Sequence, residues 1–120
     1  VQHAATAMQE WAWLFTSCGW EVDFGDEKSG AWKHPDGTYT CLERSPDLTD
    51  EAHDRLAPGI NHLAFCVADR PALDAMREQA AGRGWRELFA EKYPHAGGED
   101  HTALYLENSE GFEVEVVVEP

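Results

Sequence analysis

The sequence predicts an α+β fold made of two tandem modules, each of which packs a helix on a small sheet. Residues 4–18 and 70–81 have apolar side chains at helical spacing, and each segment is followed by short stretches that alternate as strands do. The end of the first helix and the strand after it recur at an offset of 65 residues. The repeat matches Gly19 with Gly84, Trp20 with Trp85 and Phe24 with Phe89.

The first module is predicted to begin with the helix over residues 4–18, which Gly19 ends. Trp11 and Phe15 lie on its apolar stripe and would cover the sheet. The predicted strands that follow span residues 19–24, 31–33 and 38–44. By the same offset, the strand that would open this module precedes Val1, so we expect that strand to be absent from the sequence.

The length of 120 residues predicts one domain with a modest core. We expect module one over residues 1–44, a linker over 45–58 and module two over 59–120. The linker prediction rests on composition, because this stretch is polar, rich in acids and has a proline near each end.

Residues 59–67 are predicted to form the strand that opens the second module. Side chains alternate along a strand, so Leu63 and Phe65 would point to one face while His62, Ala64 and Cys66 point to the other. The first face is bulky and apolar, as packing on a helix requires. The second is small around a single imidazole, which is typical of a cavity wall.

The rest of the second module is predicted as a helix and three strands. The helix spans residues 70–81 with Asp69 as its cap, and the strands span 85–91, 101–107 and 112–118. In the last strand Val114 and Val116 share one face, while Glu113 and Glu115 share the other. Each complete module therefore reads strand, helix, strand, strand, strand.

The composition argues against several functional classes. The formal charge of −14, with only 9 Lys and Arg, leaves no basic cluster for nucleic acid or for an anionic membrane surface. No apolar run approaches the ~20 residues that span a bilayer. Three cysteines without a C-x-x-C pair predict a reducing, cytoplasmic location in which they serve as small core residues.

The module order and two local patterns resemble the vicinal oxygen chelate superfamily, which includes glyoxalases, extradiol dioxygenases, fosfomycin-resistance enzymes and bleomycin-binding proteins. One pattern is His-Leu-Ala-Phe at residues 62–65. The other is an aromatic strand, a turn that ends at Gly111, and Glu115 four residues later. The turn, Asn-Ser-Glu-Gly, is a loose version of the Asp-Pro-Asp-Gly usual in the family. The resemblance implies that the modules form a curled, barrel-like sheet around a cavity, often shared between the subunits of a dimer.

The resemblance also implies a set of metal ligands. In the metal-binding members, the first and last strands of each module supply them, which corresponds to His62 and Glu115 in module two. An imidazole and a carboxylate suit a divalent ion such as Zn, Mn, Fe or Ni. Glu43 is a further candidate from the last strand of module one, although Cys41 aligns with Glu115. A structural histidine and a solvated acidic face are the plain alternatives.

Two functions of different classes are compatible with this reading. In the first, a metal-dependent lyase, isomerase or dioxygenase binds neighbouring oxygens of a small organic substrate, and His101 and Tyr105 contact the substrate or transfer protons. In the second, a metal-free protein sequesters a flat drug or natural product, as antibiotic-resistance members do, by stacking on Trp13 and Trp32. Trp32 could equally pack at a homodimer interface. The first function requires that His62 and the acidic ligand face the same space.

Overall fold

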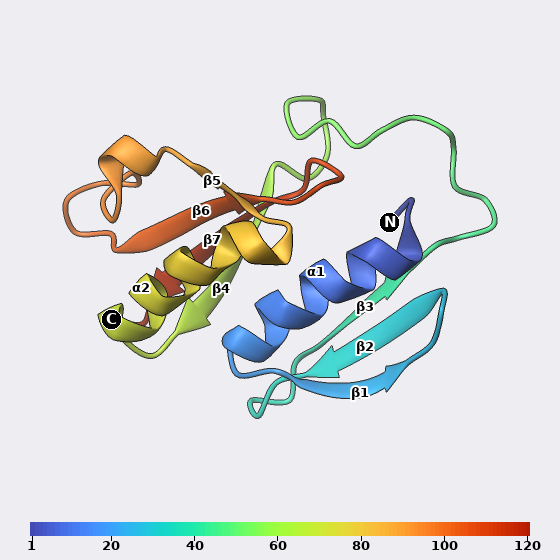
Figure 1. The fold of residues 1–120 in the computed structure, drawn as a ribbon, viewed down its shortest axis with the longest axis horizontal. Coiled ribbons are helices and arrows are strands. Elements are labelled where there is room, and N and C mark those ends of the chain that lie inside the picture. Colours follow the sequence, from blue (N-terminus) through green and yellow to red (C-terminus); the bar gives the residue numbers. More distant parts are fainter. The chain divides into compact units, whose positions relative to one another are not determined.

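The computed structural model describes all 120 residues and divides the chain into two compact units, Val1–Ala52 and His53–Pro120. The boundary falls inside the segment predicted as a linker. Each unit pairs a helix with a sheet, so the α+β class is confirmed (Figure 1). Closure of the sheets into a barrel stays a prediction. Neither α-helix has the length and apolar content that crossing a membrane requires.

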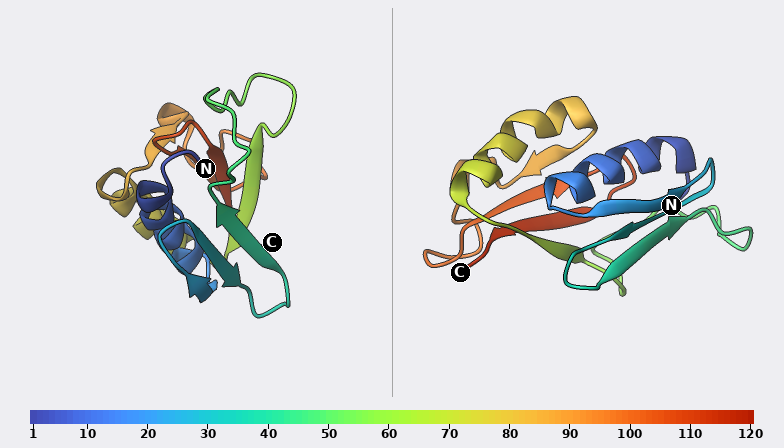
Figure 2. Two further views of the ribbon diagram at one scale, coloured as in Figure 1. Left: turned by 90° about the vertical axis from the view of Figure 1, so that its right-hand side faces the viewer. Right: turned by 90° about the horizontal axis from the view of Figure 1, so that it is seen from below.

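Unit one contains one α-helix and a three-stranded antiparallel sheet in the order β1-β2-β3. Its elements are α1 (Ala4–Ser17), β1 (Glu21–Gly25), β2 (Ser29–Lys33) and β3 (Tyr39–Glu43). The helix runs along one face of the sheet (Figure 2). Trp11, Leu14 and Phe15 are buried beneath it, and Phe15 packs on Trp32 of β2 with ring centroids 4.9 Å apart. Helical spacing alone therefore identified the buried stripe.

Unit two is a four-stranded mixed sheet in the order β4-β7-β6-β5, with β4 parallel to β7 and the other pairs antiparallel. Its strands are β4 (His62–Val67), β5 (Arg86–Leu88), β6 (Ala103–Glu107) and β7 (Glu113–Val118). The helix α2 (Arg70–Gln79) continues into the 3₁₀ turn η1 (Ala80–Arg83), and η2 (Ala90–Lys92) follows β5. The crossover through α2 returns the chain to the sheet at β5, and the antiparallel pairs of β5 with β6 and of β6 with β7 then place β7 parallel to β4.

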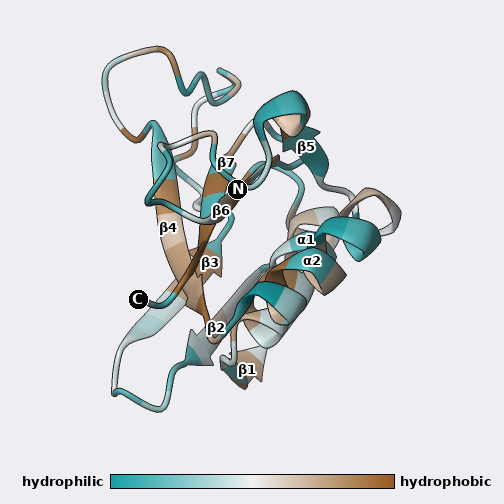
Figure 3. Ribbon diagram, turned by 90° about the vertical axis from the view of Figure 1, so that its left-hand side faces the viewer, coloured by the Kyte–Doolittle hydropathy of each residue, from teal (hydrophilic) through white to brown (hydrophobic).

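The two faces of this sheet differ in chemistry, and they are called the helix face and the site face below. The helix face carries Leu104, Val114 and Val116, which are fully buried, as is Leu73 of α2. Much of β6 and β7 is brown in Figure 3, the colour of hydrophobic residues. The site face carries the side chains that register with Glu115, including Tyr105 on β6 and Ala64 on β4.

Several boundaries and burial states depart from the sequence predictions. The strand predicted from residue 59 begins at His62, and the helix predicted to 81 changes to 3₁₀ geometry at Ala80. Asp69 caps α2 as predicted and accepts a hydrogen bond from the Ala72 amide at 2.9 Å. The assignment of all three cysteines to the core is wrong, because only Cys18 is buried.

The matched glycines of the internal repeat have nearly the same backbone conformation. Gly19 has a φ of +85° and Gly84 a φ of +87°, and each lies between a helical segment and the strand that follows. A left-handed residue at this position ends a helix and is most easily adopted by glycine. The repeat therefore reflects a shared helix-to-strand turn.

Candidate functional site

His62 and Glu115 lie on adjacent strands of unit two and are in direct contact. In the parallel register His62 pairs with Glu113 and Ala64 pairs with Glu115. Because side chains alternate along a strand, those of His62 and Glu115 point to the same face of the sheet. His62 Nε2 lies 3.2 Å from Oε2 of Glu115. Glu115 is only 8% exposed, although charged side chains are ordinarily solvated. The sequence-predicted pair thus faces the same space.

The second ring nitrogen of His62 is also engaged. Nδ1 lies 2.8 Å from Oδ1 of the preceding residue, Asn61. When Nδ1 carries the proton and donates it to this amide oxygen, Nε2 presents a lone pair toward the Glu115 carboxylate. Two acceptors 3.2 Å apart require a proton or a cation between them. Donation from the outer ring nitrogen to a polar partner is also what orients metal-binding histidines.

His101 and Tyr105 complete the cluster around Glu115. His101 precedes β6 by two residues, and its Nε2 hydrogen-bonds to Oε1, the other oxygen of the carboxylate. Tyr105 is the register partner of Glu115. Burial, together with the negative charge of Glu115 and a hydrogen bond to it, raises the pKa of Tyr105 to about 12. Its hydroxyl therefore stays protonated and serves as a hydrogen-bond donor at neutral pH.

The cluster has the donor chemistry of a divalent-metal site. Two imidazole nitrogens and a carboxylate are a common ligand set for zinc, iron and related ions. The side chains do not surround a common point as three ligands would, because the Glu115 carboxylate lies between the two rings. The observation that fits a cation is the contact of His62 Nε2 with the Glu115 carboxylate, in the tautomer that places the ring proton on Nδ1; in the other tautomer the same contact is a hydrogen bond from Nε2–H.

Two residues predicted for the site belong to unit one. Glu43 lies on β3 with an exposed side chain, and its backbone oxygen accepts a hydrogen bond from the amino terminus at 3.0 Å. Trp32 is 4% exposed and packs on Phe15 in the core of that unit. This burial gives Trp32 a structural role. Metal binding by Glu43 and substrate contact by Trp32 stay predictions.

The sequence reading missed three residues that shape the site. Asn61 orients His62, and Gly97 lies so close to the cluster that a Cβ there would be 2.5 Å from the His101 ring and 2.7 Å from the Tyr105 hydroxyl. Arg55, placed in the linker by its composition, instead binds carboxylates on the site face. Only Gly97, in a Gly-Gly turn, carried a local signal of close backbone approach.

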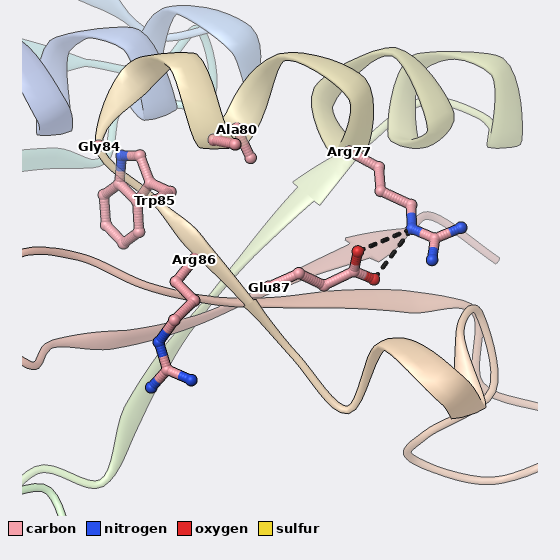
Figure 4. Close-up of a pocket in the computed structure, with 7 residues that line it drawn as sticks. Arg77, Ala80, Gly84, Trp85, Arg86 and Glu87 are labelled. Atoms are coloured by element: carbon pink, nitrogen blue, oxygen red, sulfur yellow. Dashed lines mark hydrogen bonds and ion pairs between the residues drawn. The ribbon is translucent and has the colours of Figure 1, made fainter.

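A pocket of about 400 Å³ lies away from this cluster, between α2, η1 and β5. Arg77 and Glu87 line it, and Figure 4 shows the guanidinium of Arg77 facing the carboxylate of Glu87. Nε of Arg77 is 2.9 Å from both carboxylate oxygens. Arg86 also lines the pocket and is paired with Glu107 at 2.7 Å. Each charged side chain of the pocket is therefore already engaged in an ion pair.

The fold is that of the vicinal oxygen chelate class, as the comparisons with known proteins show. No protein-family model matches the chain. The chain is 33% identical over 110 residues to the uncharacterized protein YqjT of Bacillus subtilis (strain 168), covering 89% of this chain and 84% of that protein. The similarity to this relative and to the solved structures described next shows that the chain belongs to the vicinal oxygen chelate superfamily.

Two solved structures place the chain within that fold. A putative glyoxalase from Bacillus halodurans superposes with a TM-score of 0.90 at 29% identity, covering 99% of this chain and 90% of that one. A glyoxalase/bleomycin resistance protein from Albidiferax ferrireducens T118 gives a TM-score of 0.72 at 14% identity, covering 100% and 91%. The second similarity shows the fold alone. The resemblance inferred from the sequence is confirmed.

Proposed function

We propose that this protein binds a divalent metal ion through His62 and Glu115 and, with that ion, a small organic substrate that carries two neighbouring oxygen atoms. The observation that carries the proposal is the 3.2 Å contact between His62 Nε2 and Glu115 Oε2 on the site face. A protein that only stacks aromatic ligands has no need of an imidazole and a buried carboxylate in contact. The donor set suits zinc, manganese, iron or nickel.

A bound ion would supply Lewis-acid polarisation of the substrate oxygens. Side chains of β4 and β6 would surround the ion and the substrate. The Tyr105 hydroxyl, with its pKa raised to about 12, donates a hydrogen bond without losing its proton. Ala64 and Cys66 follow His62 along β4 with small, exposed side chains on the same face. This part of the face therefore leaves room for a compact ligand.

The reaction class we propose is that of a metal-dependent lyase, isomerase or dioxygenase. Membership of the superfamily supports this proposal, as does the similarity to the structure described as a putative glyoxalase. We also propose that the protein acts as a homodimer in the cytoplasm. Exposed apolar side chains such as Val22 and Phe24 on β1 support a second subunit, because large exposed apolar residues often mark an interface.

Metal content of the purified protein tests the proposal. Protein prepared without chelator should contain near-stoichiometric divalent metal, and His62→Ala and Glu115→Ala should remove it. His34→Ala is the matched control, since His34 is a partly exposed histidine of unit one whose Nδ1 pairs with Asp36 at 3.1 Å. If the wild type neither contains nor takes up Zn, Mn, Fe or Ni, the proposal fails. Binding of aromatic drugs, followed by tryptophan fluorescence, would then be measured instead.

A further inference from the structure

We propose that Phe89 and Tyr105 form an aromatic corner on the site face, which holds a flat, uncharged ring of the substrate next to its two neighbouring oxygens. This inference rests on the proposed function and deepens it, because it names a property of the substrate that His62 and Glu115 do not define. Phe89 directly follows β5, and it is 44% exposed. Its ring meets that of Tyr105 with centroids 5.7 Å apart and an interplanar angle of 81°.

The backbone of Phe89 is the first argument. Its φ of +56° and ψ of +36° lie in the left-handed region, and Phe89 is the only residue other than glycine with a positive φ. A Cβ atom disfavours this conformation, which glycine adopts readily. Phe89 opens the 3₁₀ turn η2, where its oxygen accepts a hydrogen bond from the Lys92 amide at 2.9 Å. A glycine would form this turn more easily, and backbone strain of this kind is typical of functional positions.

The left-handed conformation also decides which face of the sheet the phenyl ring joins. Leu88 is the register partner of Tyr105 and therefore shares the site face. Glu87 points to the helix face, where it binds Arg77 of α2. Regular alternation would send Phe89 to the helix face with Glu87. The ring instead contacts Tyr105, so the turn brings it to the side of the sheet that carries the polar cluster.

Tyr105 connects the phenyl ring to that polar cluster. The Tyr105 ring also lies edge-on to the His62 imidazole, with centroids 6.4 Å apart. Its hydroxyl donates a hydrogen bond to Glu115, and a Cβ atom on Gly97 would lie 2.7 Å from the same hydroxyl. The ring is thus held by contacts on several sides. A single aromatic ring separates Phe89 from His62, so the apolar and polar groups belong to one continuous surface.

The geometry and charge of this surface define the ligand it suits. Two rings at nearly a right angle form a corner in which a third flat ring packs face to face with one and edge to face with the other. An exposed phenyl ring next to an imidazole and a carboxylate suits a small molecule with one apolar and one polar end. The Glu115 carboxylate and the formal charge of −14 favour an uncharged ligand over an anion.

Binding of two compounds that differ in the planarity of their ring tests the inference. Alpha-hydroxyacetophenone carries two neighbouring oxygens on a phenyl ring, and cyclohexyl hydroxymethyl ketone carries the same oxygens on a saturated ring. Calorimetry on the intact chain, with and without Zn²⁺, compares the wild type with Phe89→Asn, Phe89→Tyr and Tyr39→Ala. Asparagine removes the ring but tolerates the left-handed conformation, so the turn is retained. Tyr39, an aromatic residue of β3 in unit one that is 71% exposed, is the matched control.

We expect the wild type to bind the phenyl compound about 2–12-fold more tightly than the saturated one, which is the stabilisation of an aromatic pair expressed as a ratio of affinities. Phe89→Tyr and Tyr39→Ala should keep this preference, because both retain a ring at residue 89. Phe89→Asn should bind the two compounds equally. Far-UV circular dichroism verifies that each variant is folded.

Three results would overturn the inference and leave the proposed function intact. They are equal affinity of the wild type for both compounds, an unchanged preference in Phe89→Asn, and no binding of either compound at about 10 mM. If Phe89→Asn changes only the molar mass measured by light scattering, the ring belongs to an interface between subunits and the inference is wrong. A preference that persists in a protein that takes up no metal would instead overturn the proposed function and retain the aromatic corner.

Discussion

Arg55 bridges two carboxylates on the site face, and its removal should destabilise unit two. Its Nη1 lies 2.6 Å from Glu113 and its Nε lies 3.3 Å from Glu107. The two acids are register partners on β7 and β6, so they face each other directly. Like charges opposite each other on neighbouring strands repel. Arg55 therefore offsets a repulsion that the sheet itself creates.

The size of the effect follows from burial. The side chain of Glu113 is 4% exposed, and in Arg55→Ala its carboxylate would remain buried without the cation. Breaking a buried ion pair in this way costs about 3–5 kcal/mol. Arg55 itself is 24% exposed, so water compensates part of this loss, and we expect the free energy of unfolding to fall by about 2–3 kcal/mol. Glu107 retains Arg86 at 2.7 Å.

Urea unfolding followed by circular dichroism measures this free energy, with Arg83→Ala as the control for loss of an exposed arginine. Glu113→Gln in the Arg55→Ala background should recover much of the loss, because it removes the unpaired charge. If Arg55→Ala is no more destabilising than Arg83→Ala, the account of this cluster is wrong.

The pH dependence of the same variant provides a second check. Hydrogen bonds from Arg86 and then Arg55 lower the pKa of Glu107 below its ordinary value of 4.5. A lowered pKa contributes stability that is present above the ordinary value and lost as the pH falls through the folded-state pKa. The difference between Arg55→Ala and the wild type should therefore shrink in acid. A difference that grows as the pH falls would contradict the assignment.

Three further predictions concern the site itself. Asn61→Ala should weaken metal binding about 10-fold, because the imidazole beside it loses its orienting acceptor; unchanged affinity by calorimetry would rule out that role. Gly97→Ala should destabilise the protein by about 1–3 kcal/mol in thermal unfolding, while Gly82→Ala, where a Cβ meets nothing within 4 Å, should not. The pKa of Tyr105, about 12, should fall in Glu115→Gln, as ultraviolet titration would show. The raised pKa contributes stability that is fully present below pH ~10 and is lost as the pH rises toward 12.

The sequence predicted well those features that depend on local periodicity. The stripe through Trp11 and Phe15 gave the buried face of α1, and alternation along residues 112–118 placed Glu115 opposite Val114 and Val116. Alternation also placed His62 away from Leu63, which made a shared site with Glu115 a testable expectation. The contact between them depends on a parallel pairing of strands that are far apart in the sequence.

Features that depend on long-range contacts escaped prediction. Arg55 lies in an acidic, proline-flanked stretch, and nothing local shows that it folds back onto β6 and β7. Glu113 and Glu115 resemble a solvated acidic face because burial of a carboxylate depends on partners that arrive from other elements. Trp32 resembled an available ring, whereas its packing depends on how α1 crosses the sheet.

The location of a bound metal ion tests the central claim most directly. Sub-stoichiometric Mn²⁺ broadens the NMR signals of nuclei near it, so the backbone amide resonances of the isotope-labelled chain report where it binds. Our account predicts that broadening begins at His62, His101 and Glu115, and that Glu115→Gln abolishes it there. Broadening that begins at another acidic stretch, such as residues 47–54, or that is unchanged in Glu115→Gln, would contradict the assignment of this cluster as the metal site.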